Sequence, residues 1–151
     1  MIQTRNQLES DNDAVKSIVA AATNELRSIY HPVKTNVQKN SDNLIGMVAT
    51  VKSDVVGLAE FHIDGKSILV RGLAVSPTHR RQGVATAIME NLRLRAKKEG
   101  KTELKLSTIK ETGNVKIFLK MGFSVVTEEI SEIYKSTQGG QVTLVNMCKN
   151  A

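Results

Sequence analysis

The segment from Leu73 to Thr86 constrains the fold most, because it passes from an apolar strand through a basic, glycine-containing turn into a helix. A helix that opens at about Gly83 leaves its first backbone N–H groups without partners inside the helix, and its dipole places partial positive charge at the same end. Arg80 and Arg81 add fixed charge, while Gly83 and Ala85 leave room for an anion to approach the main chain. The segment therefore predicts a binding site for a pyrophosphate group.

The helix that follows has an apolar face. Val84, Ile88 and Leu92 recur every four residues, a spacing typical of a helix that packs on a sheet. The turn is therefore expected to be rigidly mounted. A plain strand–turn–helix connection with two solvated arginines fits the glycine spacing equally well, because a lone glycine-containing loop is weak evidence.

The complete motif from Leu73 to Ala85 is more specific evidence than the glycine alone. Leu-x-Val, x-Pro and then Arg-x-x-Gly-x-Ala at residues 80–85 closely resemble the acyl-CoA pyrophosphate loop of the GCN5-related N-acetyltransferase (GNAT) superfamily, whose signature reads Arg/Gln-x-x-Gly-x-Gly/Ala. Residues 117–123 resemble the later helix of that family and its Lys-x-Gly-Phe turn. The two matches occur in the family's order and cover roughly residues 55–126.

The resemblance implies an α/β fold of the acyl-CoA N-acyltransferase type, with one N-acetyltransferase domain over residues 1–151. Its central mixed sheet would have about six or seven strands flanked by helices. The sheet would splay between the fourth and fifth strands, and the thioester arm of acetyl-CoA, the co-substrate, would lie in that gap. Gly72, near the end of the fourth strand, favours a bulge that frees main-chain N–H groups.

The family's cofactor contacts map onto matching positions in this chain. The pyrophosphate would be bound by Arg80, Arg81, Gln82, Gly83, Val84, Ala85 and Thr86. The pantetheine arm would lie along Leu73, Ala74 and Val75, and its distal part would be bordered by Asn114 and Phe118.

The proton-transfer residues depart from the family pattern. Phe118 stands where members often carry a tyrosine that protonates the departing thiolate, Glu111 stands at the usual asparagine position, and the carboxylate often found before Leu-x-Val is absent. A thiol with a pKa near 8.5 still leaves tolerably without an acid. Tyr134, or less favourably Tyr30, is the candidate donor, and a purely structural tyrosine is the alternative for each.

A base is needed if the attacking amine is protonated. Glu60 shares one face of the strand at residues 55–63 with Leu58 and His62, which makes Glu60 and its histidine neighbour the best base candidates. The alternative is an ordinary polar strand face. The resemblance thus implies acetyl transfer to a primary amine by direct attack in a ternary complex, with a non-catalytic acyl-CoA sensor of the same fold as the alternative.

Composition agrees with this interpretation. The 151 residues, 40% of them hydrophobic, suit one globular domain. There is no apolar run of about 18 residues and no secretory leader, so a cytoplasmic protein without a membrane segment is expected. The single cysteine, Cys148, and three scattered histidines offer no disulfide and no metal-ligand spacing.

The net charge of +6 raises the question of a nucleic-acid partner, but aromatic residues make up only 3% of the chain and tryptophan is absent. A solvated basic helix at residues 93–101 explains the charge better. The amine acceptor is not identified, its recognition is expected from residues 29–43 and 134–141, and a homodimer is left open.

The order of elements alternates. Strands are predicted at residues 2–5, 44–51, 55–63, 67–75, 103–107, 123–129 and 142–149, and helices from about residue 13 to His31, at 83–99 and at 114–121. Short turns at 52–54 and 64–66 favour an antiparallel meander.

Overall fold

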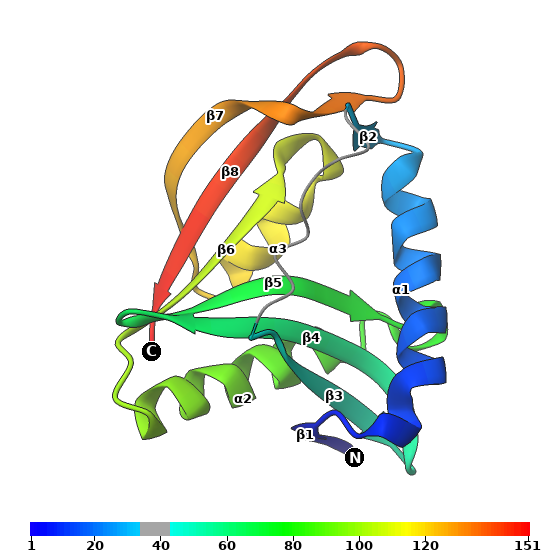
Figure 1. The fold of residues 1–151 in the computed structure, drawn as a ribbon, viewed down its shortest axis with the longest axis vertical. Helices are drawn as coiled ribbons and strands as arrows, with labels where there is room; N and C mark the ends of the chain where they lie inside the picture. The colour runs from blue at the N-terminus through cyan, green and yellow to red at the C-terminus, as the bar shows by residue number, and fades with distance from the viewer. Residues whose placement is uncertain (34–42) are drawn as a thin grey trace.

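The computed structural model describes residues 1–33 and 43–151, which build a mixed sheet of eight strands in the order β1-β3-β4-β5-β6-β8-β7-β2 (Figure 1). The strands are β1 (Ile2–Asn6), β2 (Tyr30–Pro32), β3 (Ile45–Val51), β4 (Asp54–Asp64), β5 (Ser67–Val75), β6 (Glu103–Ile109), β7 (Ser124–Ser136) and β8 (Gly140–Asn150). The helices are α1 (Asn12–Arg27), α2 (Val84–Lys98) and α3 (Asn114–Lys120), and the short 3₁₀ turns are η1 (Glu9–Asp11), η2 (Pro77–His79) and η3 (Lys110–Thr112).

Two apolar clusters, one for each of the longer helices, hold the helices on the sheet. The predicted stripe of α2 is fully buried at Ile88 and Leu92 and packs with Phe61 of β4. The smaller cluster joins Val15 and Ile18 of α1 to β3 and β4. Because alternate residues of one strand point to opposite faces, the two clusters fix α2 and α1 on opposite sides of the sheet.

Gly57 of β4 allows α2 to approach the sheet closely. A Cβ atom at this position would lie 2.7 Å from Val84 Cγ1 and 3.2 Å from the carbonyl oxygen of Ala74. Since real Cβ atoms do not come that close to a neighbour, a larger residue would push the start of α2 away. The missing side chain therefore sets the position of the loop that precedes α2.

The sheet opens between β5 and β6, as the family resemblance implied. These two parallel strands keep register over only three residue pairs, Ser67 to Leu69 with Glu103 to Lys105, and then diverge. Figure 1 shows the resulting V, with β3, β4 and β5 in one arm, β6, β8 and β7 in the other, and α1 standing across the open side. Thr137 joins the end of α1 to the second arm, because its hydroxyl and N–H donate to the carbonyls of Arg27 and Ile29.

The sheet is larger than predicted, with eight strands against six or seven. The prediction missed β2, which has three residues and ends in Pro32, and treated His31 and Pro32 only as the end of a helix. Proline is compatible with this place because β2 is the outermost strand, where a missing N–H breaks no second ladder.

The last two strands are longer than the predicted 123–129 and 142–149. Most of β7 is solvent-exposed and it carries two register irregularities, between Val125 and Thr127 and between Ile130 and Lys135. Its sequence therefore shows no clean alternation of apolar and polar residues. The predicted meander of β3, β4 and β5 is confirmed, and the predicted bulge is present with Arg71, beside Gly72, as the extra residue.

Asp11 stabilises the junction between β1 and α1. Its carboxylate accepts two hydrogen bonds from Arg5, at 2.6 and 3.1 Å, and one from the N–H of Leu8 at 2.8 Å. The hydrogen bonds from Arg5, and then the one from Leu8, lower the pKa of the buried Asp11 carboxyl below its ordinary value. The ionised carboxylate is thus the form that stabilises the fold.

We expect Asp11→Asn to lower the melting temperature by about 5 °C at pH 7, because charge-assisted hydrogen bonds are lost at a buried site. Because the pKa of Asp11 is lower in the folded state than in the unfolded state, ionised Asp11 stabilises the folded protein fully at pH values above the unfolded pKa, near 3.9. This stabilisation is lost as the pH falls through the pKa of the folded state. The difference in melting temperature between wild type and Asp11→Asn should therefore shrink as the pH is lowered below about 4. Asp13→Asn, at an exposed position in the first turn of α1, is the control. Equal melting temperatures for wild type and Asp11→Asn at pH 7 would contradict the prediction.

Candidate functional site

A cleft of about 810 Å³ opens where β5 and β6 diverge. Four elements form its walls: the C-terminal half of α1, the end of β5, the loop into α2, and α3. The lining residues are Ala22, Glu25, Leu26, Leu73, Ala74, Val75, His79, Arg80, Arg81, Gly83, Val84, Ala85, Thr86, Asn114, Ile117, Phe118, Lys120 and Met121. The structure thus brings together in one cleft all but one of the twelve residues predicted to bind the cofactor.

The loop into α2 presents main-chain N–H groups. Arg81 and Gly83 have left-handed backbone conformations, with φ of 61° and 84°. From Arg80 through Thr86, no main-chain N–H donates a hydrogen bond to any residue that the structure describes, and the first donation is from Ala87 to the carbonyl of Gly83 at 2.9 Å. Such a run of free donors at a helix N-terminus suits an anion.

Gly83 leaves the space before these donors open. A Cβ atom built on Gly83 would meet nothing within 4 Å. Its positive φ also favours glycine on conformational grounds. The backbone conformation therefore favours glycine here, and the absence of a side chain leaves room for a group to approach the main chain.

The arginine that leads the loop is already paired. Arg80 Nη1 lies 2.7 Å from Oε2 of Glu25 on α1, and its Nε donates to the carbonyl of Val75 at 3.4 Å. Arg81 and His79 line the same end of the cleft, and Lys120 lines it from α3. Among the described residues of the lining, cations therefore outnumber the one carboxylate, Glu25.

The edge of β5 that faces β6 is free within the cleft. Leu73, Ala74 and Val75 pair with β4 on their other side, whereas the described residues of β6 are in register only as far as Leu69. Main-chain N–H and C=O groups beyond that point remain available to an extended ligand, as at any open sheet edge, apart from the Val75 carbonyl that accepts from Arg80. The free edge continues directly toward the loop with its free donors.

The wall opposite β5 is formed by α3. Thr112 Oγ1 accepts the N–H of Asn114 at 3.2 Å, which anchors the start of this helix. The ring of Phe118 is half-buried and meets the edge of Phe123, with ring centroids 6.0 Å apart. Phe118 therefore supplies apolar surface to the cleft and has no proton to give.

Gln82 is the predicted cofactor-binding residue whose side chain lies outside the cleft lining. Its amide turns back toward the carbonyl of Thr78, at 3.5 Å. Any contact from this residue would therefore come from its main-chain N–H.

Glu60 does not line the main cleft but lies beside its inner end. On β4 it is paired with Gly72 of β5, next to the pair formed by Ala59 and Leu73. Adjacent strands lie about 4.8 Å apart, so the backbone of Glu60 is one strand away from the cleft wall. Its half-buried side chain lines two smaller clefts, of about 460 Å³ against α1 and about 410 Å³ between η1 and β3.

The two tyrosines form a pair at the far edge of the sheet. The rings of Tyr30 and Tyr134 meet edge to face with centroids 5.0 Å apart, and they join β2 to β7. Burial, and then the neighbouring Tyr134, raise the pKa of Tyr30. Neither tyrosine lines the main cleft, which favours a structural role, while residues 34–42 of the predicted acceptor-recognition segment lie outside the described part of the chain.

The contribution of α1 was missed at the sequence level. Ala22 and Leu26 recur at helical spacing with Val15 and Ile18, a pattern that is typical of a face buried in the core. Instead, the C-terminal turns of α1 line the cleft together with Glu25. An acidic residue at the edge of an apolar stripe was the available signal, and it does not identify a partner such as Arg80.

Other candidate chemistry has structural explanations. Burial raises the pKa of the Cys148 thiol, whose Sγ lies 3.3 Å from a carboxylate oxygen of Glu103, so this thiol is a poor nucleophile. In the basic stretch of α2, Arg93 pairs with Glu90, and Arg95 contacts Asn6 and lies over the ring of Phe61. Within residues 1–33 and 43–151 there is no cluster of metal-ligating side chains and no helix long and apolar enough to cross a membrane.

Comparison with known proteins gives a family and a fold. The model of the acetyltransferase (GNAT) family matches residues 12–123. A GCN5-related N-acetyltransferase from Kribbella flavida superposes with a TM-score of 0.79 at 17% identity, covering 99% of this chain and 98% of that one. The ribosomal-protein-S18-alanine N-acetyltransferase from Escherichia coli gives 0.75 at 17% identity, with 99% and 94% covered.

A Bacillus subtilis acetyltransferase in complex with CoA gives a TM-score of 0.74 at 13% identity, with 100% of this chain and 99% of that chain covered. At such identities the likeness concerns the fold alone. No curated protein matches the sequence.

Proposed function

Because the chain belongs to the GNAT acetyltransferase family, we propose that it transfers the acetyl group of acetyl-CoA to a primary amine by direct attack in a ternary complex. The observation that carries this proposal is the continuity of the free donors from Arg80 to Thr86 with the free edge of β5. A ligand with a pyrophosphate at one end and an extended, amide-bearing arm fits both parts. Acetyl-CoA has this construction.

The residues of the cleft then have distinct roles. The main-chain N–H groups of residues 80–86, with Arg80 and Arg81, would bind the pyrophosphate. Leu73, Ala74 and Val75 would pair with the amides of the pantetheine arm as a further strand does. Asn114 and Phe118 would border the distal part of that arm.

The reaction forms a C–N bond to the acetyl carbonyl carbon and breaks its C–S bond. An N–H of β5 near the bulge at Arg71 would stabilise the negative charge that develops on the carbonyl oxygen. Glu60 would accept the proton from the attacking amine. The CoA thiolate, with an ordinary thiol pKa near 8.5, can leave without an acid, and Tyr134 remains the proposed donor if one acts.

Phe118 supports a second candidate function, a protein that binds acyl-CoA without turnover. The ring occupies the position from which family members often donate a proton, and it packs against Phe123. Binding and catalysis therefore have to be measured separately.

The test is a thermal shift followed by a thiol-release assay. We expect acetyl-CoA to raise the melting temperature in proportion to RT ln(1 + [L]/Kd), and free thiol to appear only when a suitable amine is added. A shift without thiol release across a broad panel of amines would favour the non-catalytic function. No shift at millimolar acetyl-CoA would refute both functions.

A further inference from the structure

The ion pair between Glu25 and Arg80 joins two walls of the cleft. It joins the last turns of α1 to the loop before α2, 55 residues apart in the sequence, with Oε2 and Nη1 separated by 2.7 Å. Both residues line the cleft. Among the described residues of that lining, Glu25 is the only one with a carboxylate, and it is bonded to the arginine that opens the proposed phosphate loop.

The position of Glu25 is unfavourable without Arg80. The last turn of a helix carries the negative end of its dipole, where a carboxylate is disfavoured. Glu25 lies in that turn, and Oγ of Ser28 and the N–H of Ser28 both bond its main-chain carbonyl rather than its side chain. Arg80 is the cation that compensates the side chain.

The N–H groups along one edge of a guanidinium cannot bind two anions equally well at the same time. Its planar fork binds carboxylate and phosphate through the same N–H groups. Nε of Arg80 donates to the carbonyl of Val75 and Nη1 donates to Glu25, so Nη2 is the remaining nitrogen of the fork. A phosphate that binds Arg80 bidentately through Nη1 and Nη2 would take the place of the carboxylate.

Resting on the proposed function, we propose that Glu25 competes with the pyrophosphate of acyl-CoA for Arg80. Glu25 weakens acyl-CoA binding and, by taking Arg80 back, speeds the release of CoA. It is a determinant of cofactor exchange that lies on α1, outside the loop motif itself. Both side chains are about half exposed, at 40% and 54%, so they can exchange partners without disturbing the core.

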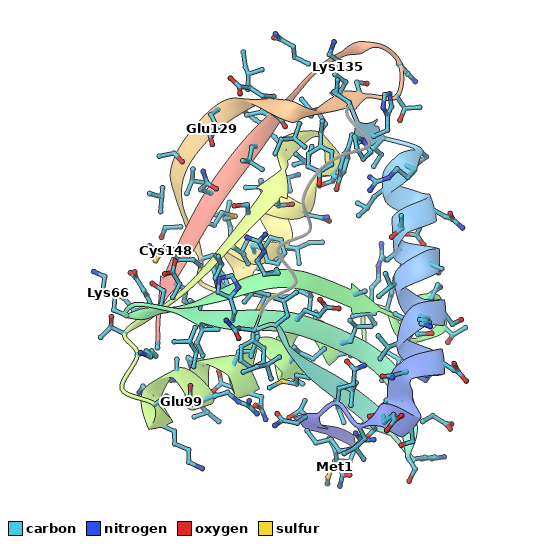
Figure 2. All side chains as sticks on the ribbon, viewed as in Figure 1. Met1, Lys66, Glu99, Glu129, Lys135 and Cys148 are labelled. Carbon is cyan, nitrogen blue, oxygen red and sulfur yellow. The ribbon has the colours of Figure 1, made fainter. Side chains whose placement is uncertain are left out.

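The experiment is a calorimetric titration of CoA into wild type, Glu25→Gln and Glu99→Gln. An exposed ion pair is worth a factor of about 1.4 to 5 in an equilibrium constant, and removal of a like charge beside the phosphates adds to it. We therefore expect Glu25→Gln to bind CoA about three to ten times more tightly, with a slower dissociation rate in stopped flow. Glu99 lies at the other end of α2 (Figure 2). The length of the helix places it about 22 Å from the loop, so Glu99→Gln, which removes the same charge, should match wild type.

A double-mutant comparison separates the ion pair from simple charge. In an Arg80→Gln background, Glu25→Gln should gain less than half of its effect on the CoA dissociation constant, because no arginine remains to be released. The inference is overturned if Glu25→Gln binds CoA no more tightly than Glu99→Gln, or if its gain is the same in both backgrounds. If wild type binds no CoA, the proposed function itself fails and the inference falls with it.

Discussion

Gly83→Glu is expected to abolish acyl-CoA binding, raising the dissociation constant by at least about 100-fold. The new side chain would project into the space that is open in front of the free N–H groups of the loop. Unit charges of the same sign about 4 Å apart repel by about 4 kcal/mol where screening is partial, so a carboxylate at this point opposes a phosphate strongly. Calorimetry with acetyl-CoA measures the loss.

Gly100→Glu provides a matched control for Gly83→Glu. Gly100 follows α2 at its other end, also has a positive φ, and also has nothing within 4 Å of a built Cβ atom. Both substitutions therefore carry a similar conformational penalty of about 1 kcal/mol and the same change of charge. Unchanged affinity in Gly83→Glu, or an equal loss in both variants, would refute the assignment of the loop.

Glu60→Gln is expected to lower kcat by about 100-fold or more while leaving the affinity for acetyl-CoA nearly unchanged. General bases contribute factors of about 10² to 10⁴, and this carboxylate lies one strand away from the cleft wall that is proposed to hold the thioester. Glutamine keeps the size of the side chain but cannot accept the proton. Initial rates of thiol release with an active amine, at saturating acetyl-CoA, give the comparison.

The pH profile distinguishes a base from a structural group. An alkylamine with a pKa near 10.4 needs a base at pH 7, but it attacks unaided when it is already neutral, so the gap between wild type and Glu60→Gln should narrow as the pH rises. Glu9→Gln, in the smaller cleft that Glu60 shares, is the control and should keep a normal kcat. If the ratio of the wild-type kcat to the Glu60→Gln kcat stays constant with pH, or if the two kcat values are equal, Glu60 is not the general base.

The cleft that is proposed to hold the cofactor could be predicted from the sequence because most of its residues are local. The residues from Leu73 to Thr86 are contiguous, and their chemistry depends on a strand end, a glycine and the first turn of a helix, each of which leaves a direct pattern in the sequence. The splay between β5 and β6 followed only from the family resemblance. Periodicity does not report where two strands stop pairing.

The parts that were missed depend on contacts between distant segments. Glu25 meets Arg80 across 55 residues, and β2 acquires its strand geometry by pairing with β7 rather than from its own three residues. The exposed surface of β7 removed the alternation that marks a half-buried strand. Glu60 and Tyr134 remain predictions because their roles depend on an acceptor whose identity no local pattern encodes.

The point at which β5 and β6 separate limits how deeply an extended ligand can enter the cleft. Toward the apex of the V, the facing main-chain groups of Ser67 to Leu69 and Glu103 to Lys105 are already bonded to one another. A chain entering from the loop can therefore advance only as far as Leu69, because going further would break sheet hydrogen bonds without replacing them in kind. If the cleft holds an acyl-CoA as proposed, this fixed stop in the backbone would limit the combined length of the thioester arm and its acyl group.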